Sequence, residues 1–205
     1  MRIPIAVLAS GRGSNFLAIL KAIKAGKCDA EVKVLITNNY DAAAITIARE
    51  HNVPVELVER KGFKSREELD VRIKELLDQY RAELVVLAGY ALLLKGKALL
   101  DAYRNRIINI HPAILPAFPG VDAQKQAFDY GAKVSGLTIH FVDESLDAGP
   151  IIYQEAVDIG ACRDPDEVAA LILKREHEAY AKVIHSFSKG KYAVEGRRVT
   201  YLPDK

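Results

Sequence analysis

Short apolar runs alternate with helical segments along the first half of the chain, and this alternation limits the possible folds more than any other feature. The run Ile3–Ala9 ends in the turn Ser10-Gly11-Arg12-Gly13, and apolar residues recur at helical spacing after Asn15. A strand, a glycine turn and a helix in this order open a parallel α/β unit. The pattern continues with strands expected at 31–37, 53–58, 84–88 and 106–110 and helices expected at 41–51, 65–80 and 93–103.

The second half begins at a proline-rich loop, His111–Gly120, which excludes a long helix or an interior strand. Beyond it we expect a helix at 124–130, strands at 136–142 and 151–157, a helix from the cap Asp164 to Phe187, and a hairpin at 192–201. The predicted fold class is α/β: a doubly wound, mostly parallel sheet with a mixed-sheet C-terminal half and a terminal hairpin. Since no linker or repeat interrupts the chain, residues 1–205 are expected to form one domain.

Composition excludes several classes of function. The 205 residues are 50% hydrophobic, which is enough for a sizeable core, and the net charge of +2 gives no sign of the basic face of a nucleic-acid binder. Cys28 and Cys162 fit no metal-knuckle spacing, and no apolar run reaches the ~20 residues of a membrane helix. We therefore expect a cytoplasmic protein that acts on small molecules, without a metal, a nucleic acid or a membrane as partner.

The glycine turn is the first candidate site. Glycines between a strand and a helix let the backbone approach a ligand, and the free N–H groups of the helix N-terminus favour phosphate. Leu17 stands near the place of the third glycine of a dinucleotide fingerprint, so a single phosphate fits better than a dinucleotide. A tight turn without a ligand is the alternative.

Asn109 and His111 form the second candidate. Two residues apart in a strand, they share one side of it, at the carboxyl edge where α/β proteins bind ligands. Asparagine can donate to an oxyanion and histidine can exchange protons, although a structural pair capping the loop is equally compatible. Asp147 precedes a Gly-Pro pair, and a carboxylate beside a histidine favours the imidazolium. The sequence does not show that Asp147 meets His111, and His140, mid-strand among apolar neighbours, is interpreted as a core histidine.

Five stretches together resemble the glycinamide ribonucleotide formyltransferases, folate-dependent enzymes of purine synthesis. They are Ala9–Asn15, Val85–Tyr90, Asn109–Gly120, His140–Val142 with Leu146–Pro150, and Glu176-His177. The Asn-x-His-Pro loop with Leu-Asp-x-Gly-Pro is typical of folate formyltransferases, and Ser-Gly-x-Gly-Ser-Asn narrows the group to the ribonucleotide enzymes.

The resemblance implies a Rossmann-like formyltransferase fold and a role for each matching residue. Asn109, His111 and Asp147 would be catalytic; Gly13, Ser14 and Asn15 would hold the substrate phosphate and Glu176 its ribose. Folate contacts would come from Arg66, Ala91, Leu92, Leu93, Leu94 and Asn109. Residues 1–105 would be the phosphate-binding half and residues 106–205 the folate-binding and catalytic half. The substrates would be 10-formyltetrahydrofolate and glycinamide ribonucleotide, with no metal, in a monomer or homodimer.

The sequence departs from the family at one place, and several other functions are alternatives. The family often has Met-Arg where this chain has Ala91-Leu92, so weaker or reshaped folate binding is expected. Formyltetrahydrofolate deformylase shares the catalytic set but passes the formyl group to water, and usually carries a further N-terminal domain. Methionyl-tRNA and sugar formyltransferases carry domains for which 205 residues leave no room. A non-catalytic nucleotide-binding module would leave the set of Asn109, His111 and Asp147 unexplained.

Overall fold

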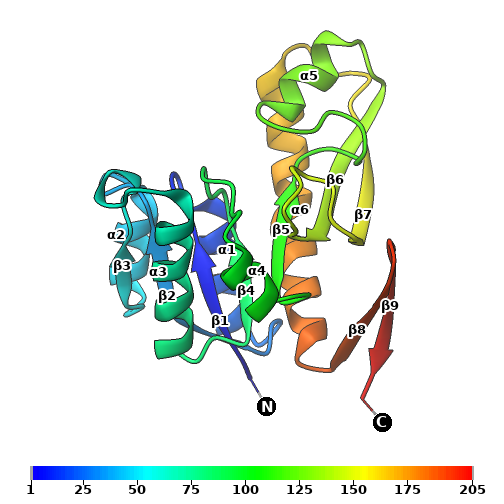
Figure 1. Cartoon of the computed structure of the whole chain (residues 1–205). Coiled ribbons are helices and arrows are strands. Elements are labelled where there is room, and N and C mark those ends of the chain that lie inside the picture. The colour runs from blue at the N-terminus through cyan, green and yellow to red at the C-terminus, as the bar shows by residue number, and fades with distance from the viewer. Residues whose placement is uncertain (1, 205) are drawn as a thin grey trace.

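A computed structural model describes residues 2–204 and contains a seven-stranded sheet beside a separate hairpin (Figure 1). Strand order in the sheet is β3-β2-β1-β4-β5-β6-β7. The first five pair in parallel, whereas β6 is antiparallel to β5 and β7 to β6. The strands are β1 (Ile3–Leu8), β2 (Ala30–Thr37), β3 (Val55–Leu57), β4 (Leu84–Leu87), β5 (Ile107–His111), β6 (Val134–Phe141) and β7 (Ile151–Asp158), and the hairpin consists of β8 (Gly190–Glu195) and β9 (Arg198–Pro203). The predicted mixed doubly wound fold is confirmed.

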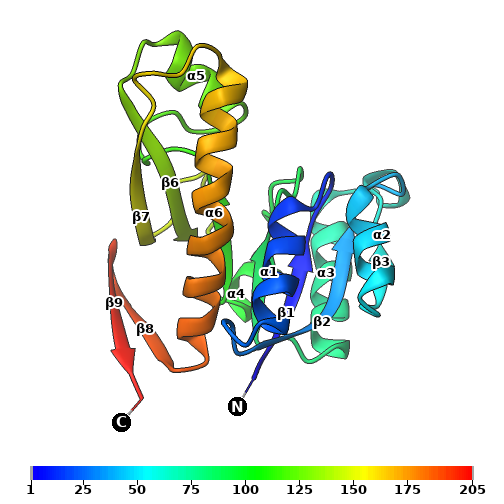
Figure 2. The same ribbon diagram turned by 180° about the vertical axis from the view of Figure 1, so that it is seen from behind.

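Helices cover both faces of the sheet. One face carries α1 (Ser14–Lys24), α2 (Ala43–Glu50) and α6 (Pro165–Phe187), and α5 (Ala123–Asp129) packs on α6. The other face carries α3 (Arg66–Gln79) and α4 (Lys97–Ala102), and a short 3₁₀ turn, η1 (Arg60–Gly62), precedes α3. Figure 2 shows α1 and α6 together on the side turned away in Figure 1.

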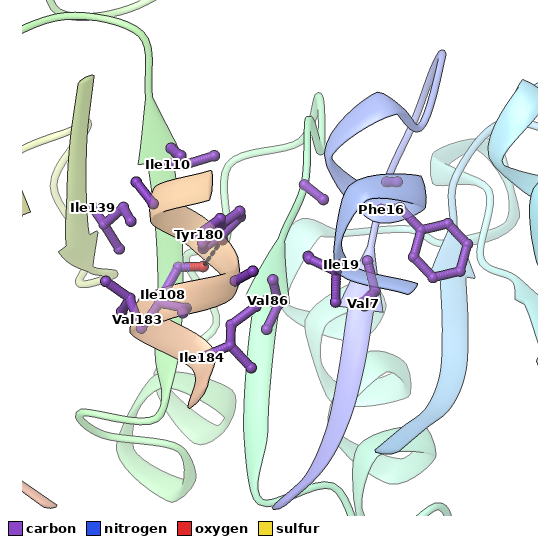
Figure 3. Packing of buried hydrophobic residues seen from close by; sticks show 14 of the residues in the cluster. Val7, Phe16, Ile19, Val86, Ile108, Ile110, Ile139, Tyr180, Val183 and Ile184 are labelled. Carbon is purple, nitrogen blue, oxygen red and sulfur yellow. Dashed lines mark hydrogen bonds between the residues drawn. The ribbon is translucent and has the colours of Figure 1, made fainter. Parts of the chain in front are cut away.

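Two hydrophobic clusters, one on each face, hold these layers together. Along β1 the side chains alternate, so that Val7 joins the α1/α6 cluster and Leu8 the α3/α4 cluster. Tyr180 of α6 is fully buried in the first cluster (Figure 3), and its hydroxyl is directed at the carbonyl oxygens of Leu87 and Ile108, at 2.8 and 3.1 Å. Burial on both faces explains why the central strands are continuous apolar runs.

Two helix starts confirm their predicted caps. Ser65 Oγ accepts the N–H of Glu68 at 3.1 Å and Asp164 Oδ1 accepts that of Glu167 at 2.8 Å. Each bond satisfies one of the N–H groups left free in a first helical turn, and loss of such a cap typically costs about 1 kcal/mol.

One element was predicted wrongly. The helix expected at 93–103 begins only at Lys97, because residues 88–96 form a loop instead. The carboxylate Oδ2 of Asp70 accepts the backbone N–H groups of Lys95 and Gly96, at 2.8 and 2.6 Å. These bonds come from a helix distant in sequence, so the local apolar spacing could not reveal them.

Within residues 2–204 no helix is long and apolar enough to cross a bilayer. In the same residues no three His, Cys, Asp or Glu side chains gather as a metal ion would require. Cys28 and Cys162 are free thiols, the first buried and the second half-buried.

Candidate active site

The predicted site residues lie at one edge of the sheet, where the parallel strands end. Ser10 follows β1, Gly89 follows β4, and Asn109 and His111 end β5. This edge borders a cavity of about 580 Å³. Apolar residues form most of its wall and polar groups gather at one end, a combination typical of small-molecule sites. The main wall residues are Tyr90, Ala91, Leu92, Leu93, Leu94, Asn109, His111, His140, Leu146 and Asp147.

His111 and Asp147 meet at the polar end of this cavity. Asp147 Oδ2 lies 3.4 Å from His111 Nδ1, and the two side chains are only 10% and 5% exposed. The other ring nitrogen, Nε2, is 2.8 Å from the carbonyl oxygen of Phe118. The carboxylate of Asp147 and the carbonyl oxygen of Phe118 thus lie at opposite edges of the ring and fix its orientation.

Asp147 is itself held in place by the loops around it. Its backbone has a φ of 49°, which non-glycine residues rarely adopt, and its Oδ2 accepts the N–H of Gly120 at 2.8 Å. The proline-rich loop therefore fixes the carboxylate that faces His111.

His140, on β6, contacts the catalytic candidate Asn109. It lies opposite Asn109 in the antiparallel pair of β5 and β6, and Asn109 Nδ2 donates to its Nε2 at 3.3 Å. The Nδ1–H donates to the carbonyl oxygen of Phe141 at 2.9 Å, and burial lowers the pKa of His140. A neutral ring with its proton on Nδ1 satisfies both bonds. Asn109 keeps its second amide N–H for the cavity.

The glycine turn opens α1. Gly13 caps the helix with a φ of 72°, and a Cβ there would lie 3.0 Å from Ala44, so glycine is required. Asn15 Nδ2 donates to Glu176 Oε2 at 2.9 Å, whereas the buried Asn15 Oδ1 has no partner within the described residues. Burial raises the pKa of Glu176. The fold thus joins the loop and α6, two of the predicted substrate-binding elements, 161 residues apart.

Arg66 differs from the other predicted folate residues in its position. Ala91 to Leu94 line the cavity, but Arg66 is not among its wall residues. Its Nη1 is buried and lacks a partner within residues 2–204, and its charge opposes the rise in the pKa of Asp70 that burial causes. Its charge also opposes the rise in the pKa of the wall residue Tyr90 that burial causes, so Arg66 lies near the cavity, and its contact with folate stays a prediction.

The sequence signature of the formyl transferase family matches residues 3–184, which include all of these site residues. The chain belongs to the formyl transferase family. Phosphoribosylglycinamide formyltransferase of Bacillus subtilis is 43% identical over 179 residues, covering 87% of this chain and 91% of that protein. The Escherichia coli enzyme of the same name is 36% identical, with 91% and 88% covered.

Solved structures lead to the same family. Glycinamide ribonucleotide transformylase 1 of Symbiobacterium toebii superposes with a TM-score of 0.94 at 41% identity, covering 98% of this chain and 94% of that one. At this identity the likeness extends beyond the fold to the kind of enzyme.

The contacts of two residues at this formyl transferase site were not predicted from the sequence. His140 is the buried histidine that was expected, but it also contacts Asn109 across the strand pair, which only the register of β5 and β6 reveals. Ser10 was treated as part of the glycine turn, yet its hydroxyl accepts the N–H of Ala91 in the cavity wall at 2.7 Å. No local sequence signal distinguishes either role.

Gly13→Ala is expected to destabilise the fold by about 1–2 kcal/mol, because an L-residue is strained at this left-handed φ. Gly11→Ala is the control, since a Cβ there would meet nothing within 4 Å and no positive φ is involved. Its stability should change by less than about 0.5 kcal/mol. Urea unfolding measures the free energy of unfolding of both variants. Equal stability of the two would contradict a requirement for glycine at the left-handed φ of position 13.

Proposed function

We propose that this chain transfers the formyl group of 10-formyltetrahydrofolate to the amine of glycinamide ribonucleotide, a step of purine synthesis. The observation that carries the proposal is the meeting of Asn109, His111 and Asp147 at one end of a largely apolar cavity. Membership of the formyl transferase family, with phosphoribosylglycinamide formyltransferases as relatives, supports the same reaction.

The cavity suits a reduced folate. A volume of about 580 Å³ accommodates a flat bicyclic ring, and the loop Gly89–Leu94 offers both apolar side chains and backbone groups to it. Leu92, which replaces the arginine common in the family, packs on the α3/α4 cluster. This wall is therefore apolar here, in line with folate binding that relies on backbone groups.

The ribonucleotide would bind at the glycine turn. The α1 N-terminus presents free N–H groups and a positive dipole end to its phosphate, next to Gly13 and Ser14. Asn15 and Glu176, already hydrogen-bonded to each other, would face its ribose and phosphate. In this proposal each half of the chain contributes to both substrates, since Ala91–Leu94 precede residue 106 and Glu176 follows it.

The catalytic residues act on charge that develops during transfer. As the substrate amine attacks the formyl carbon, Asn109 donates its free amide N–H to the oxyanion, and the charged His111 stabilises it. Asp147 holds the orientation of His111, and its negative charge stabilises positive charge on the ring. The amine loses one proton and the departing folate nitrogen gains one, carried by His111 or a water molecule.

A spectrophotometric assay tests this proposal directly. Purified protein is supplied with 10-formyltetrahydrofolate, and loss of the formyl group is followed with and without glycinamide ribonucleotide. Turnover that requires the ribonucleotide is expected. Equal turnover without it would identify a deformylase instead, and no turnover in either case would contradict both and direct attention to another formyl acceptor.

Both proposed substrates are small molecules that occur in the cytoplasm, where free thiols such as Cys28 and Cys162 also persist. We place the enzyme there, acting without nucleic acid or a membrane. A monomer and a homodimer are both compatible with a site built from one chain.

A further inference from the structure

Ser10 stands between the two proposed substrate sites. It follows β1 and begins the glycine turn, but its side chain is directed toward neighbouring strands. Its hydroxyl donates to Asn38 Oδ1 and accepts the backbone N–H of Ala91 at 2.7 Å. Its own N–H donates to the carbonyl oxygen of Gly89 at 3.0 Å. Ser10 therefore holds the chain on both sides of Tyr90.

The segment that Ser10 holds, Gly89–Gly96, forms one wall of the cavity and contains no helix or strand. At its far end Asp70 accepts the N–H groups of Lys95 and Gly96. A Cβ on Gly96 would lie 2.5 Å from Asp70 Cβ, so this close approach requires glycine. Side chains from other elements thus fix the wall at both ends.

The direction of the Ser10 hydroxyl follows from its partners. A serine hydroxyl has one proton, and Asn38 Oδ1 can only accept it. The oxygen lone pairs then remain for Ala91, whose N–H would otherwise lose its partner. Of the two side-chain bonds of Ser10, one therefore reaches the wall of the folate cavity and the other reaches Asn38 after β2, and neither lies within the glycine turn.

We propose that Ser10 is a positioning residue for folate binding: its hydroxyl holds the wall Gly89–Gly96 at the distance from Asn109 and His111 that a bound folate requires. This rests on the proposed function. A role in the phosphate turn, which the position of Ser10 in the sequence favours, makes the opposite prediction about which substrate is affected.

The test is steady-state kinetics of Ser10→Ala with each substrate varied separately. Loss of one hydrogen bond in the wall should raise KM for 10-formyltetrahydrofolate about 3- to 10-fold. KM for glycinamide ribonucleotide and kcat should stay within about twofold. Ser10→Thr, which keeps a hydroxyl, should restore most of the folate KM.

Two further variants sharpen the result. Asp70→Ala removes the acceptor of both N–H groups at the other end of the wall and should also raise the folate KM selectively. Ser188→Ala is the matched control, because it removes a hydroxyl bond of 2.7 Å, to the carbonyl oxygen of His185 at the end of α6, and should change no parameter.

The outcomes separate this proposal from the proposed function. Turnover of the unsubstituted chain is measured first, and its absence would overturn both. Normal turnover combined with an unchanged folate KM in Ser10→Ala would overturn the positioning role alone. So would an equal or larger rise in KM for the ribonucleotide, which would assign Ser10 to the phosphate turn.

Discussion

Asp147→Asn is expected to lower kcat by a factor of about 100 or more while the chain remains folded. The substitution removes the negative charge that lies 3.4 Å from His111 Nδ1 and that would stabilise positive charge on this ring during transfer. The oxyanion would then lose a positive partner, and loss of one such stabilising group typically costs 100- to 1000-fold in rate.

Asn109→Ala and His111→Ala should lower kcat by a similar factor, because each removes one group directed at the oxyanion. Glu144→Gln provides the control: this exposed carboxylate lies three residues from Asp147 in the same loop, and kcat should stay within about twofold. Rates come from the formyl-transfer assay, and circular dichroism checks folding. Near-wild-type rates in all three site variants would show that the catalytic set has been assigned wrongly.

Gly149→Ala is expected to damage both stability and activity. A Cβ at this position would lie 1.8 Å from the carbonyl oxygen of Phe141, a distance that no real Cβ shows, so the backbone must move. Crowding of a packed interior typically costs about 1–3 kcal/mol. Because Gly149 follows Asp147 by two residues, the same movement displaces the carboxylate, and a misplacement of about 1 Å can lower the rate about 100-fold.

Gly62→Ala is the matched control for this crowding effect. A Cβ on Gly62 would meet nothing within 4 Å, so its free energy of unfolding should change by less than about 0.5 kcal/mol. Urea unfolding and kcat are measured on both variants. If Gly149→Ala retained the stability and the rate of Gly62→Ala, the close contact between the Asp147 loop and β6 would be refuted.

Only part of the arrangement of Asn109, His111 and Asp147 could be predicted from the residues themselves. Asn109 and His111 could be paired from sequence, since residues two apart in a strand share a side. Their meeting with Asp147, 36 residues beyond His111, depends on where β6 returns and how the loop after it bends. No pattern of neighbouring residues encodes that bend, although resemblance to the family named all three residues.

Most helices and strands, two caps and the parallel winding followed from the sequence alone. Hydrophobic spacing, glycine turns and capping side chains act between residues close along the chain. Only the tertiary structure decided that residues 88–96 form a loop, that His140 contacts Asn109, and that Ser10 serves the folate wall. Each of these depends on hydrogen bonds between elements 25 or more residues apart. Such bonds form only once the strands have paired and the helices have packed, so the same local residues would be compatible with several other arrangements.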